Sequence, residues 1–114
     1  MKQYTTPEQT AKLIELGFER PKFEIETQLC NIKGQPMRVA TIVGDYSIGE
    51  LIEMLPKEIT NEGLTDSLSI YTDHNKMWTV EYSNVLGALL STYRTELIDA
   101  LYDMIIKLKE NGVI

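Results

Sequence analysis

The sequence predicts a single α+β domain over residues 1–114, with a four-stranded antiparallel sheet of two hairpins and three helices, in the order α-β-β-α-β-β-α. Three observations lead to this prediction. Two helical segments begin with a capping box, four segments have the pattern of strands, and the C-terminal segment carries an apolar stripe with helical spacing. The prolines fall where elements begin or end, and no repeat or Ser/Gly-rich linker divides the chain.

The first predicted element is a helix over residues 7–16. Thr6 has the position of an N-cap, Pro7 that of the first helical residue, and Gln9 that of the capping-box partner. Gly17 follows as the C-terminal stop, because glycine readily adopts the left-handed conformation found there.

A hairpin is predicted next. From residue 23 to 30 apolar and polar residues alternate, which is typical of a strand with one buried face. The strand from 37 to 43 is apolar on both faces, so we expect it to lie inside the sheet. The segment between them contains Gly34 and is short enough for an antiparallel connection.

A second helix is predicted after Ser47, which forms a capping box with Glu50. Pro56 ends this helix. Its apolar residues follow the spacing of one helical face: Ile48, Leu51, Ile52 and Leu55.

The second half predicts another hairpin and a long helix. Strands over 68–72 and 77–82 are joined by a polar turn at 73–76, after a polar loop that contains Gly63. The segment 83–94 fits a helical turn, a short strand or an apolar loop broken by Gly87.

The last helix is expected from about Thr95 to Glu110, with Thr95 or a residue near it as N-cap and Gly112 as the stop. Its apolar side chains fall within about 60 degrees of Leu101 on a helical projection, so we expect them to be buried. They are Leu97, Ile98, Leu101, Met104, Ile105 and Leu108.

Composition excludes several classes of function. Seventeen acidic and eleven basic residues give a net charge of -6, which disfavours binding to nucleic-acid phosphates or anionic lipid. One cysteine and one histidine cannot form an internal disulfide or a typical zinc site, and we expect no cofactor. The first residues lack a signal-peptide core and no apolar stretch approaches the roughly 20 residues of a membrane span. We therefore expect a cytoplasmic protein.

Three segments carry a resemblance to known proteins: YTTPEQTAKLIELGFERPK at 4–22, YSIGELIEMLPKEI at 46–59 and ELIDALYDMIIKLKENGVI at 96–114. They resemble a family of small proteins of unknown biochemical function from gut Bacteroides-type bacteria, often encoded in prophage-like or mobile regions. They cover about half of the chain and coincide with the predicted helices. The resemblance implies a small bacterial or phage-derived protein and transfers no catalytic or binding residue.

His74 and Cys30 are the two residues with the most reactive side chains. His74 beside Asp73 could act as a base or ligand, but the neighbouring Asp and Asn are typical of a solvated hairpin turn. Cys30 is close to Lys33, but no helix N-terminus precedes it to activate its thiol as a nucleophile. We interpret both as structural.

Two carboxylate pairs share a strand or helix face: Glu24 with Glu26, and Asp99 with Asp103. Acid-base catalysis needs one carboxyl that is removed from water, and both pairs are expected on solvated surfaces. We therefore expect no catalytic residue and no enzyme.

Some apolar side chains have no predicted element that packs over them, and these side chains indicate an interface. Tyr102 and Ile106 fall outside the core stripe of the last helix, and Trp78 lies on a strand that is apolar on both sides. The alternative is that the first helix or the segment 85–90 covers them. We expect a non-enzymatic protein-interaction module. Its partner is another protein or a second copy of the chain, which would make a homodimer. The alternative function is an acidic nucleic-acid mimic that inhibits a host DNA-binding protein.

Overall fold

The computed structural model describes residues 1–21, 24–43 and 45–114, and confirms the α+β class with three helices in that part of the chain. The order is α-β-β-α-β-β-β-β-α. The helices are α1 (Pro7–Glu15), α2 (Ile48–Met54) and α3 (Leu97–Glu110). The strands are β1 (Glu24–Ile32), β2 (Gln35–Val43), β3 (Glu58–Asn61), β4 (Leu64–Thr72), β5 (Trp78–Asn84) and β6 (Gly87–Arg94).

The prediction that the two hairpins join in one sheet is wrong. β1 and β2 form a two-stranded sheet of their own, and the four-stranded antiparallel sheet has the order β3-β4-β5-β6. Two strands outside the predicted pairs complete it. β3 lies in the predicted polar loop and turns into β4 through Glu62 and Gly63, whose φ angles of 51° and 82° fit the type I′ turn of a tight hairpin. β6 lies in the second part of the segment 83–94, for which a short strand was one of the open alternatives.

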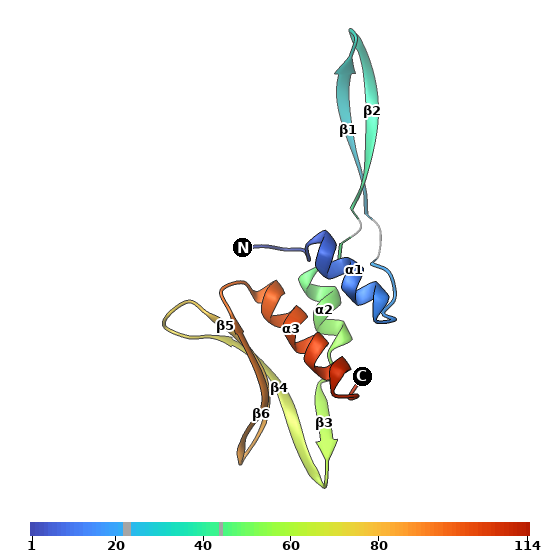
Figure 1. Ribbon diagram of the computed structural model, residues 1–114. Coiled ribbons are helices and arrows are strands. Elements are labelled where there is room, and N and C mark those ends of the chain that lie inside the picture. The colour runs from blue at the N-terminus through green and yellow to red at the C-terminus, as the bar shows by residue number, and fades with distance from the viewer. Residues whose placement is uncertain (22–23, 44) are drawn as a thin grey trace.

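The β1–β2 hairpin projects away from the rest of the protein as an arm (Figure 1). Its register runs from Glu24 opposite Val43 to Ile32 opposite Gln35, and Lys33 and Gly34 form the turn. The expectation that the second strand lies inside a sheet is wrong, because each strand of a two-stranded sheet is an edge. Phe23, the predicted first residue of β1, lies outside the described residues.

All three helices lie on the same side of the sheet β3–β6 (Figure 1). α3 packs on β5 and β6, and α2 packs on α3. The predicted stripe of α3 is buried as expected, and with Leu13, Leu51, Val80 and Tyr82 it forms the hydrophobic core. α3 begins at Leu97, so its N-cap is Glu96, the residue next to Thr95.

Both predicted capping boxes are present. The backbone N–H of Gln9 donates to Thr6 Oγ1 over 3.2 Å, and that of Glu50 donates to Ser47 Oγ over 3.2 Å. Each pair satisfies amides that have no partner inside the helix. These local bonds explain why the starts of α1 and α2 could be read from the sequence.

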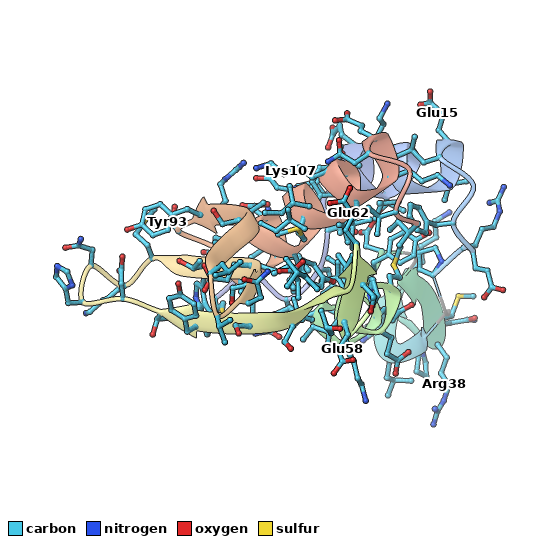
Figure 2. The ribbon with its side chains drawn as sticks, turned by 90° about the horizontal axis from the view of Figure 1, so that it is seen from below. Glu15, Arg38, Glu58, Glu62, Tyr93 and Lys107 are labelled. Carbon is cyan, nitrogen blue, oxygen red and sulfur yellow. The ribbon has the colours of Figure 1, made fainter. Side chains whose placement is uncertain are left out.

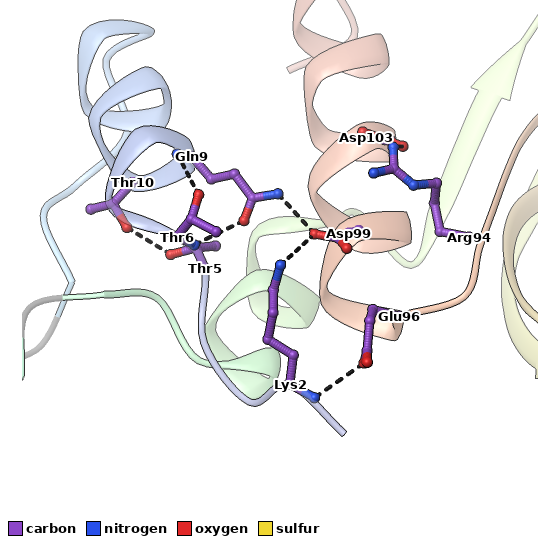
Figure 3. Close-up of polar contacts among 9 residues, drawn as sticks. All are labelled: Lys2, Thr5, Thr6, Gln9, Thr10, Arg94, Glu96, Asp99 and Asp103. Carbon is purple, nitrogen blue, oxygen red and sulfur yellow. Dashed lines mark hydrogen bonds and ion pairs between the residues drawn. The ribbon is translucent and has the colours of Figure 1, made fainter.

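A chain of hydrogen bonds attaches α1 to the segment before α2. The Tyr46 amide donates to Thr5 Oγ1 over 3.1 Å, and the Thr5 and Thr10 hydroxyls are 2.7 Å apart (Figure 3). Thr10 Oγ1 also lies 2.7 Å from Asp45 Oδ1. An ionised carboxylate only accepts, so Thr10 donates its proton to Asp45 and Thr5 donates to Thr10. The direction of the whole chain is therefore fixed.

Asp99 joins the N-terminal segment, α1 and α3 (Figure 3). Its Oδ1 accepts from Lys2 Nζ and from Gln9 Nε2, each over 2.9 Å. Burial alone would raise the pKa of Asp99, but the bonds from Lys2 and Gln9 outweigh burial and lower this pKa. The expected surface pair of Asp99 and Asp103 is thus divided, because Asp103 binds Arg94 over 2.8 Å.

Asp99→Ala is expected to lower the free energy of unfolding by about 2 kcal/mol at pH 7, since it removes two hydrogen bonds to a charged group. The contribution of a carboxylate with a lowered pKa is present above its ordinary pKa and is lost as the pH falls through the lower value of the folded state. The difference between wild type and variant should therefore shrink in acid. Urea unfolding at pH 7 and at decreasing pH measures it.

Asp103→Ala is the matched control, because it removes an ion pair that is more exposed, at 49% and 29% for Arg94 and Asp103 against 35% and 16% for Lys2 and Asp99. We expect a loss of at most about 1 kcal/mol. Equal losses for the two variants would contradict the role given to Asp99.

Candidate interaction surfaces

The three predicted interface residues are half-buried. Trp78, Tyr102 and Ile106 all pack against the core. Trp78 lies opposite Arg94 on β6 and opposite Thr72 on β4, in the set of positions that face the helices. Burial, and secondarily the charge of Asp103, raises the pKa of Tyr102. The structure therefore gives these residues partial cover without enclosing them.

The sheet face away from the helices has no described helix over it (Figure 1). Tyr71, Thr79 and Tyr93 lie directly opposite one another across β4, β5 and β6 on this face. Both tyrosines are exposed, while Thr79 between them is buried. The rows beside them contain mainly small hydroxyl residues: Ser67, Ser69, Ser83 and Ser91. This composition lets the face contact water without a cover.

Tyr93 is anchored to the turn between β4 and β5. Its hydroxyl donates to Asp73 Oδ2 over 2.5 Å, and Asp73 Oδ1 accepts from the amides of Asn75 and Met77. The bond from Tyr93 is the main cause of a lowered pKa at Asp73. His74 lies exposed in the same turn, as the structural interpretation expected.

Tyr93→Phe should raise the pKa of Asp73 toward its ordinary value, because the strongest stabilising bond to the carboxylate is lost. NMR titration of the Asp73 carboxyl carbon measures this pKa directly. Tyr71→Phe is the control, since Tyr71 shares the row but makes no described hydrogen bond to Asp73. An unchanged Asp73 pKa in Tyr93→Phe would contradict the assignment.

The turn between β5 and β6 is the most exposed apolar feature of the described residues. Val85 is 99% exposed, Leu86 is 79% exposed, and Leu89, at the irregularity in the β5–β6 ladder, is 51% exposed. We call these three residues the apolar tip. Neither Val85 nor Leu86 has a positive φ, and Asn84 and Gly87 hold the first and last positions that a type I turn favours. The spacing of Asn84 and Gly87 is the signal from which the sequence could have predicted this turn.

Polar contacts hold the apolar tip in place. Asn84 Oδ1 accepts from the Leu86 amide over 2.7 Å, and Asn84 Nδ2 donates to Asp66 Oδ1 over 2.8 Å. Asp66 is buried and lies on the neighbouring strand β4. The turn is thus bonded both within itself and to the sheet, so the exposed side chains are presented from a supported backbone.

A hollow of about 310 Å³ lies where the arm joins the body. Its walls are Phe18, Glu19, Arg20, Tyr46, Glu50, Glu53 and Met54. The Tyr46 hydroxyl donates to the Glu19 carbonyl, and burial, followed by the charge of Glu50, raises the pKa of Tyr46 while Arg20 opposes this. Apolar walls beside carboxylates suit a side chain that is apolar or positively charged.

The remaining candidates do not assemble into a reactive centre among the described side chains. The carboxyl groups with a shifted pKa, Asp73 and Asp99, both shift downward, whereas a general acid at neutral pH needs an upward shift. Within residues 1–21, 24–43 and 45–114, no three His, Cys, Asp or Glu side chains gather to hold a metal ion. Cys30 lies on the arm, and the side chains of Glu24 and Glu26 are outside the described set.

Comparison with known proteins adds no relative: no family model, no curated protein and no solved structure matches this chain. Within the described residues, no helix has the length and apolar character that crossing a membrane requires.

Proposed function

We propose that this protein is a non-enzymatic interaction module that binds another protein through the apolar tip. The observation that carries the proposal is the exposure of Val85, Leu86 and Leu89 on a turn that is bonded to the sheet. Exposed apolar side chains that lie close together on a soluble protein often mark a protein-interaction site.

Burial of the apolar tip would also supply enough free energy for a small contact site. Fully burying a Val or Leu side chain contributes about 1.5–3 kcal/mol, so two or three such residues can anchor a partner. The turn is already formed in the free protein, which limits the conformational entropy that binding would cost.

The alternative function as a nucleic-acid mimic has less support. A mimic needs free carboxylates aligned along one surface. Several acids here serve the fold: Asp66 binds Asn84, Asp99 binds Lys2 and Gln9, and Asp103 binds Arg94. The charge of -6 is therefore partly committed to internal contacts.

The double variant Val85→Ser and Leu86→Asn tests the proposal. Both new residues suit an exposed type I turn, so the fold should be retained while the apolar surface is lost. Immobilised wild type and variant are incubated with a lysate of a Bacteroides-type gut bacterium, the source that the sequence resemblance suggests. We expect mass spectrometry to identify a protein that wild type retains and the variant loses at least about tenfold.

Ser67→Thr with Ser69→Thr serves as the matched control, because it changes two positions on the open sheet face and leaves the tip unchanged. Thermal unfolding confirms that all variants are folded. Retention that is indifferent to the tip, or no retention above bare resin, would overturn the proposal.

The half-buried surface of Trp78, Tyr102 and Ile106 stays a predicted second contact. Ile106→Glu should weaken retention of the same protein if that surface takes part in binding. Because Ile106 packs against the core, the variant is also expected to lower stability by about 1–3 kcal/mol. Reduced stability with full retention would remove this surface from the interface.

A further inference from the structure

We propose that the open sheet face, the face of β4, β5 and β6 that points away from the helices, binds an arginine side chain of another protein. The guanidinium pairs with the carboxylate of Glu81 and lies beside the rings of Tyr71 and Tyr93. The site is separate from the apolar tip. The inference therefore goes beyond the proposed function and does not depend on it.

The strand register brings these three side chains together. On the open sheet face, Glu81 of β5 lies between Ser69 of β4 and Ser91 of β6. Tyr71 and Tyr93 are each two residues further along those neighbouring strands, so both are diagonal neighbours of Glu81. Diagonal neighbours in an antiparallel sheet are about 7–8 Å apart, which long and aromatic side chains can span. Both rings therefore flank the space in front of the Glu81 carboxylate.

Glu81 is a half-buried carboxylate to which the described residues supply no ion pair. Cross-strand pairs of unlike charge stabilise a sheet, but serine occupies both positions opposite Glu81. The outward positions of the described strands β4, β5 and β6 hold no lysine or arginine. Lys107 of α3 reaches the edge of this row, but its ammonium donates to the Ser91 carbonyl over 2.9 Å (Figure 2). The charge of Glu81 is therefore complementary to a cation from another molecule.

Tyr71 orients the Glu81 carboxylate and leaves it room for a ligand. The Tyr71 hydroxyl is hydrogen-bonded to Glu81, and burial followed by this bond raises the pKa of Tyr71. A carboxylate has about four acceptor positions, so one bond leaves places for the two parallel N–H groups of a guanidinium. Asp73 differs, because it already accepts from Tyr93 and from two backbone amides. Glu81 is thus the acceptor on this face with free capacity.

The two tyrosine rings favour arginine over lysine. A cation within about 6 Å of an aromatic ring is attracted to the face of the ring. The planar guanidinium can stack on a ring while it pairs with a carboxylate through two N–H groups, whereas an ammonium cannot do both in this way. Tyr71 and Tyr93 are exposed and so accessible to such a group. A flat face covers little of a small ligand, so we infer that the arginine belongs to a protein, whose neighbouring residues can hydrogen-bond the serines around Glu81.

The experiment titrates the isotope-labelled full chain with the capped tripeptide Gly-Arg-Gly. The amide signals of Ser69, Glu81 and Ser91 are followed by NMR and should shift in a saturable manner. The same tripeptide with citrulline, which keeps the shape of arginine but not its charge, should bind at least about tenfold more weakly. The tripeptide with lysine should bind at least about threefold more weakly, because it loses the stacking on the rings.

Variants of the site separate the carboxylate from the rings. Glu81→Gln should weaken binding of the arginine tripeptide at least about tenfold, and Tyr71→Leu with Tyr93→Leu should weaken it at least about threefold. Tyr71→Phe should retain binding, because the ring remains and Glu81 loses only an internal donor. Glu8→Gln is the matched control, since it removes an exposed carboxylate from α1, on the helix side of the sheet (Figure 1), and should leave binding unchanged.

Binding that is indifferent to Glu81→Gln, or equal for the arginine and citrulline tripeptides, would overturn the proposal. Equal binding of the lysine tripeptide would also contradict it, because the rings would then have no role. A wild-type dimer in light scattering that Glu81→Gln dissociates would assign the site to a second copy instead. Val85→Ser with Leu86→Asn should bind the tripeptide like wild type, so this test and the test of the apolar tip can fail separately.

Discussion

Burial of the apolar stripe of α3 against β5 and β6 is the packing interaction on which the rest of the protein depends. The fully enclosed side chains of α3, including Leu101 and Met104, meet Val80 and Tyr82 from the sheet, and α2 packs on the outer side of α3. Because α1 and α2 assemble around α3, all helices gather on one face of the sheet. The other face is left to short polar residues and tyrosines, which water can solvate.

Polar contacts hold the segments that contribute few side chains to the hydrophobic core, namely α1 and the turn after β5. α1 contributes Leu13 to the core but is held largely by Gln9 on Asp99 and by Thr10 on Asp45. These bonds are directional, so they define where α1 lies on α3 more sharply than apolar contact alone. The same logic applies to the turn after β5, where Asn84 ties an exposed segment to Asp66.

The sequence predicted the elements with strong local signals and missed those defined by distant partners. The capping boxes at Thr6 and Ser47 and the stripe of α3 depend on neighbours within one or two turns, so pattern alone was sufficient. β3 has four residues and exists because β4 pairs with it, and strand periodicity does not say which strand becomes the neighbour. For the same reason, the sequence did not show that β1 and β2 form a sheet of their own. Asp99 was expected on a solvated face because local pattern does not show its partners Lys2 and Gln9, which are 97 and 90 residues away in the sequence.

The edges of the two sheets differ in how they are protected from pairing with other chains. β6 is an edge strand, but Lys107 of α3 donates to the Ser91 carbonyl over 2.9 Å and so occupies a main-chain acceptor on it (Figure 2). β3, the opposite edge, has only four residues. Charged side chains and short edge strands are common means by which proteins prevent strands from pairing with other chains. β1 and β2 have nine residues each, and each keeps one edge with which no strand of the described residues pairs.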